Sequence, residues 1–514
     1  MGLRTIRGIA LQRLIAIIGA VAFLLQGYNQ SMMNGLLTLD GFIEVLPQID
    51  TLNTTGAEQA HNATLQGLVV SIYEIGCAFG ALSCLFIGDR LGRPKTMLVA
   101  GGIALVGGIV QASTYSFGQT VAGRIISGLG VGIYTGTVPM YVSETAEASR
   151  RGRLVSIEGA FALGGIALAA WVNFGFFHAT GAINYRFPIA FQLLFVIILL
   201  SMYPLLPESP RWLVKKERLE EAAVIMSRLL DRDVESVEVA REVAAIHGAL
   251  QRDKNHKNEY SGNIFSRNKN RHLHRTILAC GITMTTQLTG INVIPFFSTT
   301  ILEGTLGYSG SVARILAGSL NITLAMGGIA AIFLIERFGR RKLMFFSTFS
   351  MVVCQGAVCG LSSNLSNPVA AKATLFFYFA AMFSLPIGMF IVPFMYASEI
   401  APLGIRHKVA GLAAATSWFF NFMVAEVTPV AINSIAWKYY IVFTVCSAAG
   451  CIVIYFFYPE TQGLSLEEID DIFVQSESIF DTVRVASNLP RGFDALEVEF
   501  DEKPQQVLAH VERV

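Results

Sequence analysis

Charged residues are scarce in this sequence. They make up 15% of its 514 residues, whereas about 25% is usual for a soluble protein. The 38 basic and 37 acidic residues also nearly cancel, which leaves a formal net charge of +1. A chain without an excess of basic residues has little to attract a polyanion, so nucleic acid is excluded as a partner.

Histidine and cysteine are few as well, and neither is spaced to bind a metal ion. The chain has 8 His and 7 Cys, and the Cys lie inside apolar runs, where a disulfide framework is not expected. Paired catalytic carboxylates and a phosphate-binding glycine loop are also lacking. The glycines of residues 128–132 lie in an apolar run and indicate helix packing. We therefore expect no metal site, no cofactor and no enzyme activity.

Long apolar runs are abundant. A helix that spans a bilayer needs about 20 mostly apolar residues. Twelve runs qualify, and they predict an all-α membrane protein with twelve transmembrane helices in two six-helix bundles. The predicted spans are residues 12–38, 65–87, 97–116, 119–141, 154–177, 187–206, 275–302, 312–335, 343–362, 370–396, 408–431 and 437–458.

The spans divide the chain into an N-terminal six-helix bundle (1–206), a charged linker (207–274), a C-terminal six-helix bundle (275–460) and a polar tail (461–514). The linker pattern predicts an amphipathic helix over residues 217–250. The tail pattern predicts a short helix at residues 464–468 and a disordered remainder. No small-residue cleavage site is obvious after the basic start, so we interpret the first run as a spanning helix rather than a signal peptide.

Three charged motifs occur twice, in the same order. Residues 89–95 (DRLGRPK) correspond to 336–342 (ERFGRRK), residues 140–146 (MYVSETA) to 395–401 (MYASEIA), and residues 207–209 (PES) to 459–461 (PET). An internal repeat of this kind, placed between apolar spans, is typical of a transporter built from two parallel repeats.

The loops between the spans predict an orientation. Lys and Arg gather on one side, in residues 90–95, 150–153, 337–342 and 406–408, whereas residues 41–64 contain neither. Basic loops stay on the inside of a membrane. We therefore expect a multi-pass protein of the cell membrane with the linker and both termini in the cytoplasm. Glycosylation triplets at Asn53, Asn62 and Asn364 then lie outside, while a fourth at Asn321 falls inside a span and is a chance match.

Together, these motifs resemble the sugar porter branch of the major facilitator superfamily, in particular its fungal hexose and polyol transporters. Further matching segments are GR at residues 123–124, PESPRW at 207–212 and QLTGIN at 287–292, and the match runs over residues 20–470. The resemblance implies the major facilitator fold with a cytoplasmic helical linker. It also implies alternating access, a small-molecule sugar or polyol as substrate, and a monomer in the lipid bilayer.

The resemblance gives the repeated charges a second role beyond orientation. Carboxylates and guanidinium groups at one membrane face can form hydrogen-bonded pairs that clamp helices together. Alternating access implies a cytoplasmic gate whose pairs form in the outward-facing state and break in the inward-facing state. The alternative is that the charges only orient the chain and solvate its surface. The predicted gate residues are Asp89, Arg90, Arg93, Glu144, Arg151, Glu208, Arg211, Glu336, Arg337, Arg340, Glu399, Arg406 and Glu460.

Interrupted helices in the middle of the bilayer predict the binding site. Gly290 and Pro295 interrupt one span beside the amides of Gln287 and Asn292, and residues 385–394 hold a second interruption. Amides suit a hydroxyl-rich solute because they donate and accept hydrogen bonds without charge. Helix bridging by a buried Asn is the alternative. The solute contacts that the resemblance implies are Gln287, Asn292, Asn321, Trp418 and Asn421.

The sequence departs from the family pattern at this pocket. Thr286 stands for the first Gln of a Gln-Gln pair, Phe394 for a Trp, and Gly159 for a Gln, while a Phe pair at residues 296–297 replaces a Tyr pair. We keep Thr286 and Phe394 among the substrate-binding candidates. Because the pocket has lost polar groups, a standard hexose is in doubt, and a polyol, a pentose or a modified sugar stays open.

Coupling to protons is the second open question. Proton-coupled members of the family carry Asp in the first helix, where it can pair with an Arg of the fourth; here Asn29 faces Arg124 in that pattern. Asn carries no proton, so the resemblance favours facilitated diffusion. Glu74, Glu158 and Glu426 nevertheless lie within spans, where ionisable groups are costly and usually functional. Proton symport through one of them is the alternative, as is an internal salt bridge with Arg124.

A nutrient sensor on the same scaffold, which binds a solute without moving it, is a further alternative. Such sensors carry long signalling tails, whereas residues 462–514 are a modest tail. Uptake of any solute would separate a transporter from a sensor.

Overall fold

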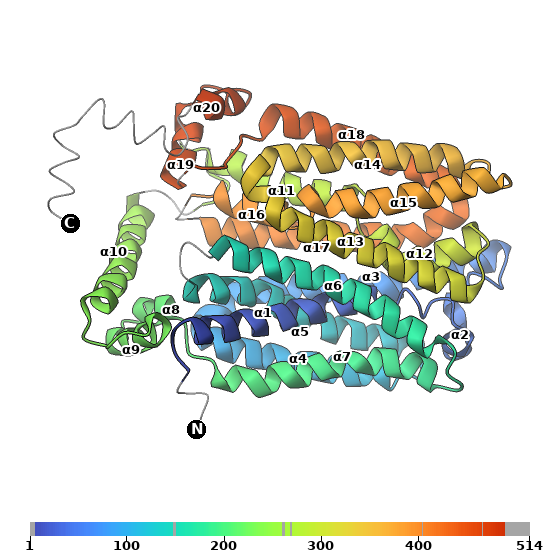
Figure 1. Ribbon diagram of the computed structural model, residues 1–514, viewed down its shortest axis with the longest axis horizontal. Helices are drawn as coiled ribbons and strands as arrows, with labels where there is room; N and C mark the ends of the chain where they lie inside the picture. Colours follow the sequence, from blue (N-terminus) through green and yellow to red (C-terminus); the bar gives the residue numbers. More distant parts are fainter. Residues whose placement is uncertain are drawn as a thin grey trace.

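The computed structural model describes residues 6–146, 151–259, 263–267, 270–402, 405–464 and 466–488, and within these ranges it is helical with no strand (Figure 1). Eleven segments of the described residues are long and apolar enough to cross a membrane. The last of them, Lys408–Phe457, holds 50 residues and contains two helices that are separated at Ala436, where φ is 46°. The eleven segments therefore supply twelve crossings, as the sequence predicts.

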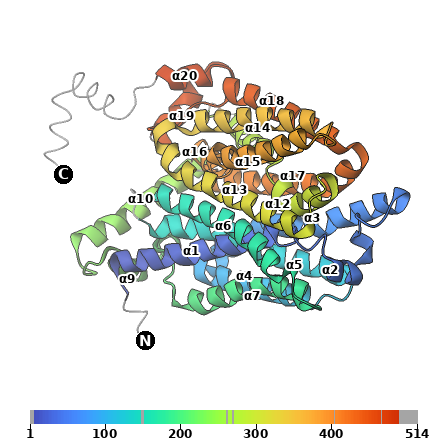
Figure 2. The same cartoon turned by 45° about the vertical axis from the view of Figure 1, so that its right-hand side comes forward.

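The crossings form two bundles that lie side by side, one built from each half of the chain (Figures 1 and 2). The N-terminal bundle consists of α1 (Gly8–Ser31), α3 (Gly56–Leu91), α4 (Arg93–Ala112), α5 (Phe117–Thr145), α6 (Arg151–Phe177) and α7 (Ile183–Met202). The C-terminal bundle consists of α11 (His272–Leu288) with α12 (Val293–Thr300), α13 (Gly310–Phe338), α14 (Arg340–Ser362), α15 (Pro368–Met389) with α16 (Val392–Glu399), α17 (Arg406–Ile435) and α18 (Tyr439–Phe457).

Two helix pairs form the larger contacts between the bundles: α3 packs on α17, and α6 packs on α13. The approach is close enough to require glycine, since a Cβ on Gly67 of α3 would lie 2.5 Å from the Glu426 carbonyl oxygen of α17. Elsewhere large apolar side chains are exposed, for example Phe79 (64%) and Phe333 (74%). Such a surface is stable only against lipid, so this is a multi-pass membrane protein.

Glycine ends a helix at the same place in each repeat. Gly92 (φ 83°) separates α3 from α4, and Gly339 (φ 87°) separates α13 from α14. A Cβ at Gly92 would lie 2.2 Å from Glu208 Oε2, and one at Gly339 would lie 2.5 Å from Glu460 Oε2. Both the left-handed backbone and the close carboxylate exclude a side chain, so the repeated motif has Gly for a structural reason.

Both predicted helix interruptions are present. The chain leaves helical geometry between α11 and α12, where Gly290 has φ 78°, and again between α15 and α16. Gly388, just before the second break, lets the backbone approach α14, since a Cβ there would lie 1.9 Å from the Leu343 carbonyl oxygen. These breaks expose polar backbone and side-chain groups inside the C-terminal bundle.

The helices outside the bundles define two ends of the molecule. We call the end that carries α8 (Pro210–Lys215), α9 (Leu219–Leu230), α10 (Val237–Glu259), α19 (Leu466–Gln475) and α20 (Thr482–Asn488) the linker face (Figure 1). The end that carries α2 (Asp40–Val45) is the opposite face. The linker is anchored to the N-terminal bundle by Gln12 Nε2, which donates to the Leu229 carbonyl oxygen at 3.1 Å.

Some predicted boundaries were wrong. The first span was expected to reach residue 38, but α1 ends at Ser31 and turns follow it. The expected loop 41–64 contains α2 and the first residues of α3, and the single amphipathic helix expected over 217–250 is divided into α9 and α10. The tail was expected to hold one short helix at residues 464–468 and to be disordered after it, but α19 continues to Gln475 and α20 spans Thr482–Asn488. Residues 489–514 lie outside the described residues.

Candidate functional site

Buried amides meet at the break between α11 and α12. Asn292 Nδ2 donates to Gln287 Oε1 at 2.9 Å and to Asn421 Oδ1 of α17 at 2.7 Å. Gln287 Nε2 donates to Ser417 Oγ of α17 at 2.9 Å. We call Gln287, Asn292, Ser417 and Asn421 the amide cluster; their residues are 7%, 5%, 3% and 1% exposed. Because the turn at Gly290 brings Asn292 back beside Gln287, the predicted interruption assembles three of the predicted contact residues.

Ser417 was not predicted, although it lies directly before Trp418 on the face of α17 that meets α11. The four other candidates, Thr286, Trp418, Phe394 and Asn321, stand apart from this hydrogen-bond network. Thr286 Oγ1 donates to the Ile282 carbonyl oxygen of its own helix at 3.0 Å. Trp418 is half-buried, and Phe394 is 43% exposed, so its ring is not enclosed with the amides.

Asn321 of α13 is fully buried, and neither atom of its side-chain amide has a hydrogen-bond partner. Buried polar groups in folded proteins are normally satisfied, so this amide marks a place for a polar ligand or water. Its burial within α13 also agrees with the expectation that its glycosylation triplet is a chance match.

Arg124 ties three helices of the N-terminal bundle together. It is fully buried on α5, and its guanidinium donates to the carbonyl oxygens of Val69 (3.0 Å), Val70 (2.6 Å) and Asn29 (3.1 Å). It also lies 4.7 Å from the centre of the Tyr73 ring. The side chain therefore serves α1 and α3, but it does so through backbone oxygens rather than through a carboxylate.

Glu74 of α3 is the acidic residue that acts on Arg124. Its carboxylate is fully buried, and neither oxygen has a hydrogen-bond partner. The groups that act on it electrostatically are the Arg124 guanidinium and the Asn421 side chain. Since Asn421 belongs to the amide cluster, Glu74 lies between the arginine of one bundle and the cluster of the other. The sequence shows Glu74 within a span, but not this position.

The other coupling candidates lie elsewhere. Asn29 turns its side chain to its own bundle: Nδ2 donates to the Leu25 carbonyl oxygen at 3.1 Å, and Oδ1 accepts from Ser127 Oγ at 3.4 Å. Glu158 of α6 is 2% exposed, has no hydrogen-bond partner and packs near Gly19 of α1.

Glu426 of α17 is the third acidic candidate. Its Oε2 accepts a 2.6 Å hydrogen bond from Ser71 Oγ of α3, so it bridges the two bundles. The carboxyl is thus already engaged with a neutral partner, which distinguishes it from the carboxyls of Glu74 and Glu158.

At the linker face, the first copy of the charged motifs forms a hydrogen-bonded group. Arg93 binds Glu144 through two bonds, from Nε to Oε2 (2.9 Å) and from Nη2 to Oε1 (2.8 Å). Glu208 Oε1 accepts from the Arg93 backbone N–H at 2.8 Å, and Tyr141 donates to the Pro207 carbonyl oxygen at 2.7 Å. Burial raises the pKa of Glu208, while the backbone N–H groups of Ser209 and Arg93 oppose that shift.

The second copy repeats this arrangement, except that both side-chain bonds from the arginine go to one carboxylate oxygen. Arg340 binds Glu399 Oε1 through Nη2 (2.9 Å) and Nε (3.2 Å). Glu460 Oε1 accepts from the Arg340 backbone N–H at 2.9 Å, and Tyr396 donates to the Pro459 carbonyl oxygen at 2.9 Å. Each of these ion pairs lies inside one bundle. They connect helices of that bundle to one another and do not join the two bundles. The predicted role as a cytoplasmic gate stays a prediction.

The remaining predicted gate residues are less engaged or cannot be placed. Arg90, Arg211, Glu336 and Arg337 are exposed. Arg406 Nε donates to the Ala401 carbonyl oxygen at 3.1 Å. The side chains of Asp89 and Arg151 lie outside the described residues.

One of the predicted glycosylation residues is wrong. Asn53 and Asn364 are exposed, as a glycan requires. Asn62, however, is 5% exposed inside α3, and its Nδ2, the atom that would carry a glycan, donates to the Asp50 carbonyl oxygen at 2.8 Å. The sequence triplet alone does not reveal that α3 begins before it.

Two six-helix bundles, one of which holds a polar cluster at a broken helix, have the architecture of a membrane transporter. A family model described as "Sugar (and other) transporter" matches residues 15–473. The chain belongs to this family of sugar transporters, which is part of the major facilitator superfamily.

Relatives and solved structures agree with this assignment. The chain is 34% identical over 491 residues to "Sugar transporter STL1" of Saccharomyces cerevisiae, covering 94% of this chain and 85% of the relative. It is 36% identical over 454 residues to "MFS-type transporter oryC" of Aspergillus oryzae, covering 87% and 82%. The fold matches a proton:xylose symporter, XylE, bound to 6-bromo-6-deoxy-D-glucose, with a TM-score of 0.74, 22% identity and coverage of 90% and 99%. An inward-open structure of XylE from E. coli matches with a TM-score of 0.71, 22% identity and coverage of 89% and 99%.

Proposed function

We propose that this protein moves a small uncharged polyol or sugar across the cell membrane, with the linker face in the cytoplasm and the opposite face outside. The amide cluster carries this proposal. Its side chains donate and accept hydrogen bonds without a net charge, which suits the hydroxyl groups of an uncharged solute. An uncharged cluster gives no electrostatic preference for an acidic or a basic solute. The basic loops of the linker face support the orientation.

The residues around the amide cluster favour a solute with fewer hydroxyl groups than a standard hexose. Phe296 and Phe297 are 1% exposed, and Thr286 keeps its hydroxyl on its own helix, so these positions offer no free polar group. Asn321 adds an unpaired amide on the neighbouring α13. Fewer polar contacts suit a solute with fewer hydroxyls, such as a short polyol or a pentose.

Counterflow identifies the solute directly. Cells that lack their own carriers are preloaded with one unlabelled candidate, a short polyol, a pentose or a hexose, and the entry of its labelled form is followed. We expect the polyol or the pentose to give the larger overshoot. An equal or larger overshoot with the hexose would contradict the assignment, and no overshoot with any candidate would favour the sensor.

We further propose that transport is coupled to protons through Glu74. The prediction of facilitated diffusion depends on Asn29, but Glu74 supplies a buried carboxyl beside Arg124 that Asn29 does not provide. A buried carboxylate with no hydrogen bond is costly, and protonation removes that cost. Facilitated diffusion is the alternative, and proton movement with the solute distinguishes the two.

Asn421 explains how solute and proton would be linked. Its Oδ1 accepts from Asn292, so its N–H groups remain to support the Glu74 carboxylate electrostatically, although neither Glu74 oxygen receives a hydrogen bond. A solute hydroxyl that accepts from this amide weakens that support and so favours the protonated form. By thermodynamic linkage, a bound proton then favours the solute equally. Mutual stabilisation of this sign is what a symporter needs.

A further inference from the structure

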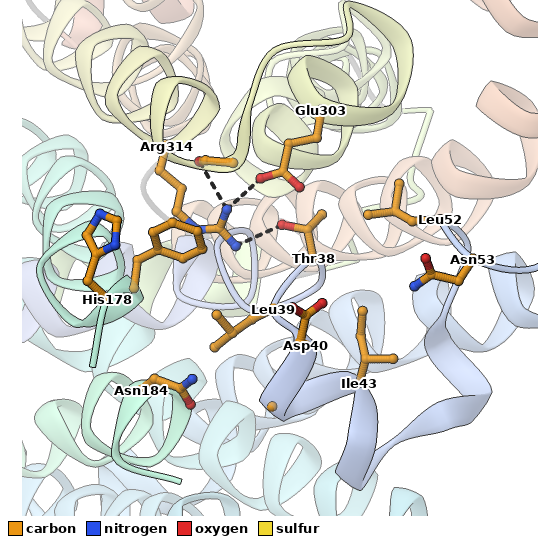
Figure 3. Close-up of a pocket in the computed structure, with 13 residues that line it drawn as sticks. Thr38, Leu39, Asp40, Ile43, Leu52, Asn53, His178, Asn184, Glu303 and Arg314 are labelled. Atoms are coloured by element: carbon orange, nitrogen blue, oxygen red, sulfur yellow. Dashed lines mark hydrogen bonds and ion pairs between the residues drawn. The ribbon is translucent and has the colours of Figure 1, made fainter. Parts of the chain in front are cut away.

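A buried arginine joins the two bundles at the opposite face, where the sequence analysis expected no gate. Arg314 lies in the first turn of α13 and is 2% exposed. It forms part of the wall of a cavity of about 410 Å³, which both bundles line, with Thr38 and Asp40 from one and Glu303 and Arg314 from the other (Figure 3). Its surroundings therefore change whenever the bundles move apart at this end.

The contacts of Arg314 divide between the bundles. Nη2 donates twice to the N-terminal bundle, to the Gly35 carbonyl oxygen at 3.1 Å and to Thr38 Oγ1 at 2.9 Å. The guanidinium also lies 3.9 Å from the centre of the Phe177 ring of that bundle. Nη1 serves its own bundle, through Glu303 and the Gly310 carbonyl oxygen (Figure 3).

This division makes the contact depend on conformation. Glu303 lies on the same bundle, so it neutralises the guanidinium whether the opposite face is open or closed. The two bonds from Nη2 and the ring contact exist only while the bundles are together. Hydrogen bonds from a charged group are stronger than those between neutral groups. Loss of the two Nη2 bonds is therefore a substantial part of the free energy needed to open this face.

The neighbouring contacts involve the same short segment, residues 31–38. Asn34 Nδ2 donates to Ser298 Oγ of α12 at 2.7 Å, and its Oδ1 accepts from the Thr299 backbone N–H at 3.0 Å. Ser31 Oγ donates to the Pro295 carbonyl oxygen at 2.9 Å. The C-terminal bundle thus binds this segment from α12 and from α13, and Arg314 provides the charged bond at its end.

We propose that Arg314 is the outer gating residue of this transporter, which holds the opposite face closed by binding Gly35, Thr38 and Phe177 and releases them when that face opens. The role goes beyond the proposed solute and coupling, since it requires neither to be known. It also gives the chain a gate opposite the charged motifs of the linker face.

Accessibility of a buried position next to this contact tests the proposal. Ala317 is one turn further along α13 and 2% exposed, and its neighbour Gly318 would place a Cβ 3.0 Å from Trp171 of α6, so this face of α13 meets the other bundle. In the full chain with Ala317→Cys, we expect Arg314→Ala to increase labelling by a membrane-impermeant maleimide about tenfold, the factor that one charged hydrogen bond controls.

Four variants separate gating from general damage. Arg186 is a matched control, because it binds Tyr115 and lies over Tyr115 and Tyr185, all within one bundle; Arg186→Ala should leave the labelling unchanged. Thr38→Val should increase it less than Arg314→Ala, and the double variant should add little to Arg314→Ala. Arg314→Ala without the added cysteine is the control for unfolding. If this variant unfolds, the 7 native cysteines become exposed and are labelled even though the added cysteine is absent.

Equilibrium binding of the transported solute from outside gives an independent readout. A larger outward-facing population lowers the half-saturation concentration, since apparent affinity scales with the competent fraction. The maximal rate of uptake should fall at the same time, because the closed state is reached less often. The proposal would be overturned if neither Arg314→Ala nor Thr38→Val changed the labelling of the Ala317→Cys chain. It would also be overturned if Arg314→Ala were labelled equally with and without the added cysteine.

Discussion

Asn421 connects the two parts of the site at the scale of single residues. It accepts a hydrogen bond from Asn292 in the amide cluster and acts on Glu74 of the other bundle. The polar solute groups and the titratable carboxyl therefore share one side chain. Substitution in the amide cluster should change solute affinity without changing the amount of folded protein, because these side chains contact one another and not the apolar core.

Gln287→Ala removes a donor to Ser417 and an acceptor for Asn292. We expect the half-saturation concentration for uptake to rise about tenfold, since a lost hydrogen bond with an unpaired partner costs on the order of 1–3 kcal/mol. Labelled uptake, normalised to protein at the cell surface, measures this. Gln355→Ala on α14 is the matched control, as Gln355 is buried in the same bundle outside the cluster. Unchanged kinetics on the transported solute would contradict the role of Gln287.

Sequence patterns identified Gln287 and Asn292, because a Gly and a Pro beside amides inside an apolar run are visible in one dimension, whereas Asn421 was named only through the family resemblance. Ser417 and Arg314 were missed for a physical reason. Their hydrogen-bond partners lie in other segments of the chain; those of Arg314 are Gly35 and Thr38. The local sequence pattern does not predict which helices pack together. The position of Glu74 beside Arg124 has the same origin, since it depends on how α3 packs against α5.

The repeated charged motifs form the same helix end in both halves of the chain. Gly339 ends α13 in a left-handed backbone, and the chain then presents the N–H groups of Arg340 and Arg341 to Glu460 at 2.9 and 3.1 Å. An acidic side chain at a helix N-terminus is favourable because it satisfies donors that lack intrahelical partners. The turn, the carboxylate and the next helix therefore form one unit in each repeat.

Gly339→Ala should disrupt that unit. The added Cβ would lie 2.5 Å from Glu460 Oε2 in a backbone region that side chains rarely adopt, and we expect a loss of about 1–3 kcal/mol of stability. Thermal unfolding of the purified protein measures the change. Gly102→Ala, in the middle of α4 with no atom within 4 Å of the added Cβ, is the control and should be neutral or slightly stabilising. Equal melting temperatures for Gly339→Ala and the parent would argue against the unit.

At the level of elements, the twelve spans were predictable because lipid requires about 20 apolar residues for each crossing. Short elements were not. The six residues of α2 are too few to show a helical period, and the end of α1 at Ser31 is set by contacts of residues 31–38 with the other bundle. Boundaries that depend on tertiary contacts cannot be found from hydropathy.

At the scale of the whole molecule, the proposed solute site, proton site and outer gate all lie along the interface between the two bundles. The α3–α17 pair carries Glu74 and Asn421 near the amide cluster and the Ser71–Glu426 hydrogen bond along the same seam. The α6–α13 pair and Arg314 close the opposite face. At the linker face, the ion pairs lie inside each bundle and do not cross the interface between them.

Proton movement during solute transport tests the central claim most directly. Purified protein in liposomes is given the counterflow-active solute from outside, and the external pH and the solute taken up are followed together. We expect alkalinisation of the external solution to accompany uptake in the parent and in Glu426→Gln. We expect none in Glu74→Gln, which should still perform counterflow. Solute uptake without proton movement in the parent, or undiminished proton movement in Glu74→Gln, would contradict it.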